Sequence, residues 1–305
     1  MKLINQSFKI ENQTVFSAIG IKKTIERCAR ICYKSESKIT DDSYEKFVNI
    51  LKIKKHSRAL EFATIHLKMS LIEFYRIQTL LIDKGKWNDI WIKYNYDLKS
   101  NKVYISTNYR YYFELLKYVN LDKYFTEEDN DYYPKRYIVH FIINRAIMDE
   151  FRTHVGLSHL AESTRYCNYN KDKFDNELTF IINNKMTLYY DNIETKDVGN
   201  NEIYINGEEV PYYDDKDEIT KKFLYSFLKA EEDYLDLINK GCKAQEARDI
   251  LPLDIKSELI SCGFADAWDN FFYRRCAKDA HPMAREIALK LQDEFIRKGY
   301  ISYIS

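Results

Sequence analysis

The chain has 305 residues, with 47 basic side chains (Lys and Arg) balanced by 47 acidic ones (Asp and Glu). This balance excludes the global positive field by which proteins bind nucleic acids or anionic membranes, so any anionic ligand must be held by a local cluster. A hydrophobic content of 45% and an aromatic content of 15% exclude a disordered chain and indicate a globular protein.

The six cysteines contain no Cys-x-x-Cys pair and no His/Cys spacing typical of zinc, so we expect free thiols and no metal site. The N-terminal segment lacks the apolar core of a signal peptide. No stretch approaches the ~18 consecutive apolar residues of a membrane helix. These features predict a cytoplasmic protein that has neither a membrane nor a nucleic acid as its partner.

Hydrophobic periodicity predicts helices and strands along the whole chain. The continuous apolar run at 137–143 is typical of a central strand. The helix after it should carry Glu150 and His154 on one face, four residues apart. The turn Asn206-Gly207 predicts a hairpin at 195–215. The other predicted strands are 2–10, 63–70, 177–183 and two aromatic runs within 87–119, and the other predicted helices are 15–33, 41–55, 73–84 and 218–239.

The segment FRTHVGLSHLAESTRYCNY (151–169) concentrates polar side chains of complementary chemistry. Its residues include two imidazoles, three hydroxyls, one carboxylate and one guanidinium, from His154, His159, Ser158, Ser163, Thr164, Glu162 and Arg165. Convergent donors after an apolar run are typical of an anion or nucleotide site. On an extended chain, Ser163 and Arg165 point to the same side and can grip one phosphate together.

This segment resembles the signature of flavin-dependent thymidylate synthases. That family carries Arg-His-Arg, seven residues and then Ser-x-Arg, with a further Ser in the gap and a Tyr afterwards. The residues in register are His154, Ser158, Ser163, Arg165 and Tyr166. The two flanking arginines are replaced by Thr153 and Val155.

A second region, 244–288, is similar to another motif of the same family. Residues in register there include Ala247, Arg248, Leu251, Pro252, Trp268, Asn270, Phe271, Phe272, Arg275, Ala280, His281, Pro282 and Arg285. The family's Asn-x-Arg is replaced by Phe264-Ala265-Asp266, and the Leu before Arg275 is replaced by Arg274.

A third stretch, HSRALEF (56–62), is similar to the family's His-x-Ser/Thr-x-x-Glu-His. His56 and Glu61 are kept, whereas Arg58 stands for the hydroxyl and Phe62 for the second His. Asn108-Tyr109-Arg110 also resembles an Asn-x-Arg of the family's longer branch, although the start of a solvated helix explains it equally well.

The resemblance implies an α+β fold, with a mixed or antiparallel sheet flanked by long helices. We expect a single catalytic domain over 1–305, with insertions near 75–130 and 185–215, in a homotetramer with active sites at subunit interfaces. The implied reaction methylates deoxyuridine monophosphate (dUMP) at C5. Methylenetetrahydrofolate would be the one-carbon donor and NADPH the reductant of FAD.

The resemblance also assigns a role to each candidate residue. Arg275 is the catalytic candidate and a substrate ligand. The other substrate ligands are Glu150, Ser163, Arg165 and Arg248, and the cofactor ligands are His56, Arg58, Thr153, His154, Val155 and Asn270. Without arginines at 153 and 155 we expect weaker flavin binding than in typical members, with Arg58 or Arg152 as candidates to compensate.

Two other functions remain open from the sequence. One is a flavin-dependent C5 modifier of pyrimidine nucleotides with a different product. The other is a degenerate paralogue that binds the nucleotide without synthase activity, which the changes at Thr153, Val155, Phe264 and Asp266 favour.

Overall fold

The computed structural model describes residues 1–302 except 166, 170–176, 187–201 and 205–216. The strands are β1 (Lys2–Ile4), β2 (Ser7–Ile10), β3 (Thr64–Ser70), β4 (Ile92–Asp97), β5 (Lys102–Asn108), β6 (Phe125–Thr126), β7 (Arg136–Asn144), β8 (Ser158–Ala161), β9 (Thr179–Ile181), β10 (Glu202–Tyr204) and β11 (Lys256–Phe264). The helices are α1 (Ala18–Tyr33), α2 (Ser43–Ile53), α3 (Leu71–Asp83), α4 (Tyr109–Leu115), α5 (Arg145–Phe151), α6 (Glu218–Asn239), α7 (Ala244–Ala247), α8 (Ala265–Arg275) and α9 (Pro282–Arg297). The predicted α+β class is confirmed.

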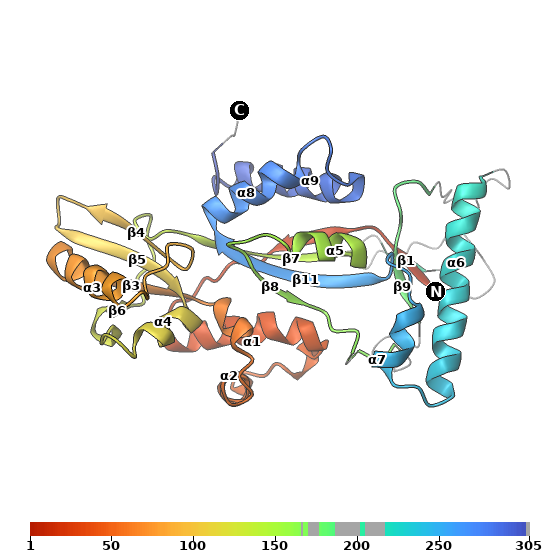
Figure 1. Ribbon diagram of the computed structural model, residues 1–305, viewed down its shortest axis with the longest axis horizontal. Helices are drawn as coiled ribbons and strands as arrows, with labels where there is room; N and C mark the ends of the chain where they lie inside the picture. Colours follow the sequence, from red (N-terminus) through yellow and green to blue (C-terminus); the bar gives the residue numbers. More distant parts are fainter. Residues whose placement is uncertain (166, 170–176, 187–201, 205–216, 303–305) are drawn as a thin grey trace.

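The central sheet has the order β2-β7-β11-β8, and all its neighbouring strands are antiparallel. Strand β7 contains the apolar run predicted at 137–143 and lies inside this sheet, as expected for a strand with two covered faces. Helices α5, α8 and α9 cover one face and α1 covers the other (Figure 1). The core between the sheet and α8 is aromatic, with Trp268, Phe271 and Phe272 buried.

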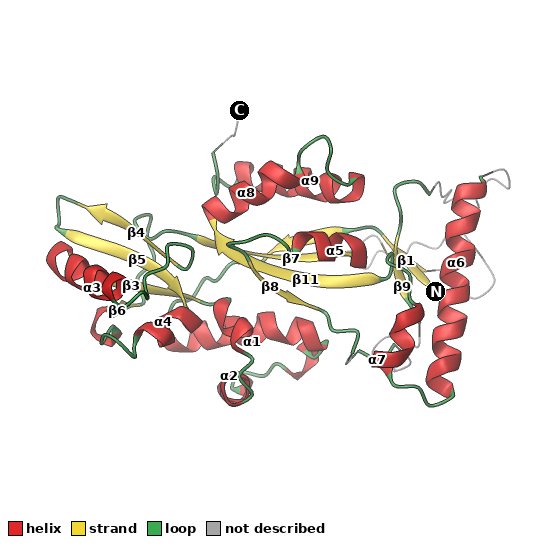
Figure 2. Cartoon of the chain, in the orientation of Figure 1, coloured by secondary structure: helices red, strands yellow, loops and turns green. Residues whose placement is uncertain are grey.

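A second antiparallel sheet, β4-β5-β3-β6, lies beside the first (Figure 2). Helices α3 and α4 pack against it, and its core also takes in side chains of α1 and α2. The segment 75–130, which we expected as an insertion, therefore supplies most of a sheet with its own hydrophobic core. A third sheet, β10-β1-β9, adjoins the long helix α6, whose bounds agree with the predicted helix 218–239.

Four local predictions were wrong. The second aromatic run within 87–119, predicted as a strand, is a strand only as far as Asn108 and continues as helix α4. The predicted strand 2–10 is two strands, β1 and β2, which belong to different sheets. Helix α5 ends at Phe151, so His154 lies beyond the helix and not on its face. Ser163 and Arg165 lie in a turn closed by the Cys167 amide, which donates to the Ser163 carbonyl at 2.9 Å, so the argument from an extended chain does not hold. The hairpin turn Asn206-Gly207 lies outside the described residues.

Gly263 in β11 allows three elements to approach closely. A Cβ at this position would lie 2.5 Å from Leu157 Cδ2, 3.0 Å from the Gly156 carbonyl oxygen and 3.4 Å from Ala267 Cβ. Gly156 itself has a φ of +94°, a left-handed conformation that side chains disfavour. The turn before β8 therefore rests directly on the start of α8, because position 263 has no side chain.

We expect Gly263→Ala to lower the free energy of unfolding by about 1–3 kcal/mol, the usual cost of overpacking a tight core. Urea denaturation of the variant measures this. The control is the same change in a Leu157→Ala background, where the main clash is removed and the added cost of Gly263→Ala should shrink. An equal cost in both backgrounds would show that Leu157 is not the constraint.

Candidate functional site

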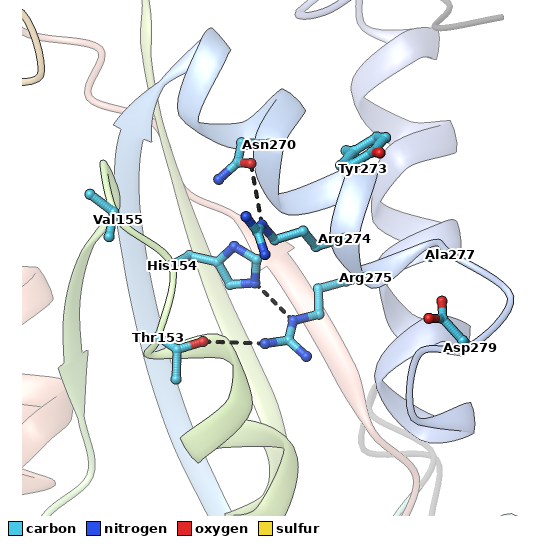
Figure 3. A pocket seen from close by; sticks show the side chains of 9 residues that line it. All are labelled: Thr153, His154, Val155, Asn270, Tyr273, Arg274, Arg275, Ala277 and Asp279. Atoms are coloured by element: carbon cyan, nitrogen blue, oxygen red, sulfur yellow. Dashed lines mark hydrogen bonds between the residues drawn. The ribbon is translucent and has the colours of Figure 1, made fainter.

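Arg275, at the C-terminal end of α8, joins the two sequence motifs. Its Nε donates a hydrogen bond to His154 Nε2 at 2.8 Å. Its Nη2 donates to the Glu150 carbonyl oxygen at 2.6 Å and to Thr153 Oγ1 at 3.3 Å, and its Nη1 pairs with the Glu150 carboxylate at 2.5 Å. Figure 3 shows the guanidinium between Thr153 and the His154 ring. Residues 121 positions apart in the chain therefore meet in one contact.

The His154 side chain is 5% exposed and packs its ring against Phe271, with 4.9 Å between the ring centroids. Burial and the nearby guanidiniums of Arg275 and Arg274 lower the pKa of His154 to about 4. The imidazole is therefore neutral at pH 7. Because Nε2 accepts from Arg275, the ring proton resides on Nδ1. That Nδ1 is buried without a hydrogen-bond partner, which is unusual for a buried polar group.

A pocket of about 690 Å³ opens beside this contact, within the volume range of small-molecule sites. It brings together five candidate residues from two motifs: Thr153, His154, Val155, Asn270 and Arg275. Its other lining residues are Tyr273, Arg274, Ala277 and Asp279. The Arg274 Nε donates to Asn270 Oδ1 at 3.5 Å, as Figure 3 shows.

Ser163, Arg165 and Arg248 form a second group at the other end of β8. Arg248 Nη1 donates to Thr164 Oγ1 at 3.2 Å, and the Ser163 amide donates to the Cys32 carbonyl at 3.1 Å. Arg165 is exposed. The four residues of β8 stand between this group and His154, a length of about 13 Å at the usual rise of a strand. Within one chain, these phosphate candidates and Arg275 therefore do not line the same pocket.

Beneath the second group lies a buried charge cluster that the sequence did not predict. Lys256 Nζ donates to Glu162 at 3.0 Å and to Glu258 at 2.5 Å, and Glu258 also accepts from Lys34 at 2.5 Å and bonds to His140 Nε2 at 2.9 Å. Burial favours the neutral amine, but the two carboxylates outweigh it and raise the pKa of Lys256. Burial likewise opposes the charge on Glu258, yet Lys256 and His140 hold the pKa of Glu258 well below its usual range. Lys256 and Glu258 are two residues apart on β11 and so share one face of the strand. This spacing is the sequence feature from which the ion pair could have been predicted.

The third group lies on the 3₁₀ turn Ser57–Glu61, with His56 just before it. His56 is exposed and its Nδ1 bonds to the Tyr33 hydroxyl at 2.9 Å. Arg58 is exposed and pairs with Glu61 at 3.5 Å. The buried Glu61 carboxylate also accepts from Ser158 Oγ at 2.6 Å and from Arg110 Nη1 at 2.6 Å. Neither His56 nor Arg58 lines the pocket beside Arg275.

The family-like Asn108-x-Arg110 has structural roles in this chain. Asn108 caps α4 by accepting from the Tyr111 amide at 2.9 Å, and Arg110 neutralises Glu61. The sequence offered the start of a helix as one explanation of this motif, and the cap that Asn108 forms on α4 confirms it.

Phe264 and Asp266, which replace the family's Asn-x-Arg, make structural contacts away from the pocket. Phe264 is buried and faces the Arg136 guanidinium, whose Cζ lies 5.5 Å from the centroid of the Phe264 ring. Asp266 pairs with Lys93 of β4 at 2.8 Å and so joins α8 to the second sheet.

Among the described residues there is no group of three or more His, Cys, Asp or Glu side chains placed to hold a metal ion. In the same part of the chain, no helix is long and apolar enough to cross a membrane.

Comparison with known proteins bears on the same region. The family model described as thymidylate synthase complementing protein matches residues 136–298, just over half of the chain, and this match contains the whole Arg275 contact. The chain belongs to this family. The resemblance drawn from the two motifs is thereby confirmed.

A curated flavin-dependent thymidylate synthase from Synechocystis sp. is 33% identical over 89 residues, which cover 28% of this chain and 41% of that relative. The chain thus aligns with less than half of that relative's length. Two solved structures of the UMP/dUMP methylase PolB from Streptomyces cacaoi are also similar. The one bound with 5-Br UMP has 11% identity and a TM-score of 0.42, covering 97% of this chain and 92% of that chain. The one bound with 5-Br dUMP has 13% identity and a TM-score of 0.43, covering 97% and 93%.

The neutral, buried His154 should make the protein less stable in acid. Well above pH 6.5 the imidazole is neutral in both the folded and the unfolded chain and contributes no pH dependence. Below pH 6.5 the unfolded chain binds a proton that the folded chain does not, so stability falls as the pH drops toward 4. We expect His154→Asn to remove about 1–3 kcal/mol of the loss between pH 6.5 and 4.5, measured by urea denaturation at each pH. An unchanged pH slope would contradict the assigned burial.

Removal of the cation at the centre of the buried charge cluster should destabilise the fold. Lys256→Met leaves Glu162 and Glu258 with less compensation, and the expected loss of unfolding free energy is about 3–5 kcal/mol by urea denaturation. Lys290→Met, which removes a surface ion pair with Glu286 on α9, is the matched control and should change stability by less than about 0.5 kcal/mol. Similar effects of the two changes would show that the cluster is solvated.

Proposed function

We propose that this chain is a flavin-dependent thymidylate synthase that converts dUMP to its C5-methylated product. Methylenetetrahydrofolate would supply the one-carbon unit and NADPH would reduce the bound FAD. The observation that carries the proposal is the contact of Arg275 with His154, because it joins the two family-like motifs at the rim of one pocket. Membership of the family supports the same reaction class.

The residues of the pocket suit a flavin nucleotide. The pocket presents a guanidinium, the amide of Asn270, the hydroxyl of Thr153 and the His154 imidazole, which has one buried, unpaired N–H. Thr153, His154, Val155 and Asn270 would hold the FAD, with His56 and Arg58 contributing from the neighbouring turn. When bound, FAD would supply the electrons that reduce the transferred carbon.

The proposed role of Arg275 is electrostatic. Carbon C5 of uracil becomes nucleophilic as negative charge builds on the ring, and a fixed guanidinium beside the ring stabilises that charge. The Glu150 carboxylate, the Glu150 carbonyl oxygen and the Thr153 hydroxyl hold Arg275 in one orientation, so little reorganisation is needed during the reaction. We assign Glu150 a substrate contact as well as this positioning.

Ser163, Arg165 and Arg248 would bind the nucleotide phosphate. The Ser163 hydroxyl acts here as a ligand and not as a nucleophile. Because β8 separates this group from Arg275 within one chain, we propose that active sites form between subunits of a homotetramer. Groups from different copies can then face one nucleotide. The net charge of zero and the absence of a membrane-spanning helix in the described residues are compatible with a cytoplasmic enzyme.

Tritium release from C5-labelled dUMP tests the reaction, with FAD and NADPH present and with or without methylenetetrahydrofolate. We expect folate-dependent release and a product mass equal to thymidylate. Arg275→Lys should lower the rate by about 100-fold or more, since a single ammonium cannot reproduce the fork of bonds to His154 and Glu150.

Other outcomes have definite meanings. No release from the wild-type protein, with dUMP bound in a parallel titration, would assign it as a nucleotide binder without synthase activity. Release with a product of different mass would assign a different C5 modification.

A further inference from the structure

Four arginine side chains act on the charge of His154, which lines the pocket, or of His159, which follows it in the chain. Arg274 and Arg275 act on the charge of His154, and Arg152 and Arg58 act on that of His159, whose Nε2 bonds to the His154 carbonyl oxygen at 3.4 Å. Two of them, Arg58 and Arg152, are the candidates named from the sequence to replace the missing arginines.

Three of these four guanidiniums already have a carboxylate partner. Arg275 pairs with Glu150 at 2.5 Å, Arg152 with Asp149 at 3.3 Å and Arg58 with Glu61 at 3.5 Å. Each of these positive charges is at least partly neutralised inside the protein.

Arg274 differs from the other three. Among the described residues, no carboxylate oxygen lies within 4.0 Å of its guanidinium, and its hydrogen bond is the long one to Asn270 at 3.5 Å. Its side chain is exposed and lines the pocket beside His154 and Asn270, as Figure 3 shows. Four of its five N–H donors therefore have no protein acceptor in this part of the chain.

We infer that Arg274 is an anion-binding residue of this pocket and holds the diphosphate of a dinucleotide, namely the FAD of the proposed function. The guanidinium fork matches two phosphate oxygens, and the Asn270 amide and the unpaired imidazole N–H add uncharged donors. The inference rests on the proposed function for the identity of the ligand, and on the geometry of the pocket for the residue.

The substitution pattern of the pocket gains an explanation from this assignment. Arg274 stands where the family-like motif has Leu, whereas Thr153 and Val155 stand where it has arginines. All three positions line the same pocket. A positive charge absent from the turn after α5 is thus supplied from α8 across the pocket.

Titration of the purified chain with FAD, followed by quenching of flavin fluorescence, tests the residue without relying on activity. Arg274→Leu should weaken FAD binding by about 10–100-fold, the usual range for one charge-assisted hydrogen bond. Arg274→Lys should recover part of the loss. The matched control is Arg297→Leu on α9, an exposed arginine paired with Glu294, which should bind FAD as the wild type does.

Three further titrations identify the group that Arg274 contacts. Riboflavin, which has no phosphate, should bind the wild type and Arg274→Leu equally. In the Arg274→Leu background, Val155→Arg should restore FAD binding, because the side chain at 155 is 74% exposed and lines the same pocket. A loss of NADPH or dUMP affinity in Arg274→Leu, with FAD affinity unchanged, would overturn the assignment to FAD.

The titrations distinguish a failure of the inference about Arg274 from a failure of the proposed function. If the wild type binds FAD and Arg274→Leu binds it equally well, the inference about Arg274 is wrong and the proposed function stands. If the wild type shows no saturable FAD binding, the flavin-dependent function itself is wrong. Circular dichroism of each variant checks that the fold is retained, as expected for changes at exposed positions.

Discussion

The Arg275 contact determines how the site is built. Its guanidinium is fixed by four hydrogen bonds to Glu150, Thr153 and His154, so the end of α8 and the turn after α5 act as one unit. Both elements pack on β11, and the aromatic side chains of α8 anchor that helix in the central core. A rigid core therefore sets the position of a polar site at its edge, which is the arrangement that preorganised binding needs.

The charged side chains at the two ends of β8 have different environments. Near the turn at Ser163, the cations Lys256 and Lys34 face the carboxylates Glu162 and Glu258, so this cluster compensates its own charges and fixes the backbone. At the pocket, burial and two arginines keep His154 neutral, and Arg274 retains its charge toward solvent. The compensated cluster thus holds the structure, whereas Arg274 keeps a charge that can bind an anion.

Much of the fold could be predicted from local patterns. The central strand around 137–143 and the helix 218–239 have strong periodicity, and both were located correctly. The failures occurred where tertiary contacts override the local pattern. The strand 2–10 divides because its halves pair with different sheets, and the second aromatic run turns from strand β5 into helix α4 at Tyr109.

Only part of the site could be predicted from the sequence. Motif register identified the residues around Arg275, but it gave no information on ion pairing. Arg58 and Arg152 were the candidates to compensate for the missing arginines, yet each has an acidic partner, and Arg274 was treated only as a departure from the motif. The Arg58 and Arg152 pairs are three residues apart and could have been read from the sequence. The pair of Arg275 with Glu150 joins two elements that are distant in the chain, and no short-range pattern predicts it.

Glu61 gives the second sheet a role in the integrity of the site. Its carboxylate is buried, and it takes hydrogen bonds from Ser158 of the signature strand and from Arg110 of α4. Deletion of the segment that carries Arg110 would leave that carboxylate short of its closest cation in a dry environment, directly against β8. A shortened form of this chain therefore cannot be made by trimming 75–130 alone; Glu61 has to be exchanged for a neutral residue in the same step.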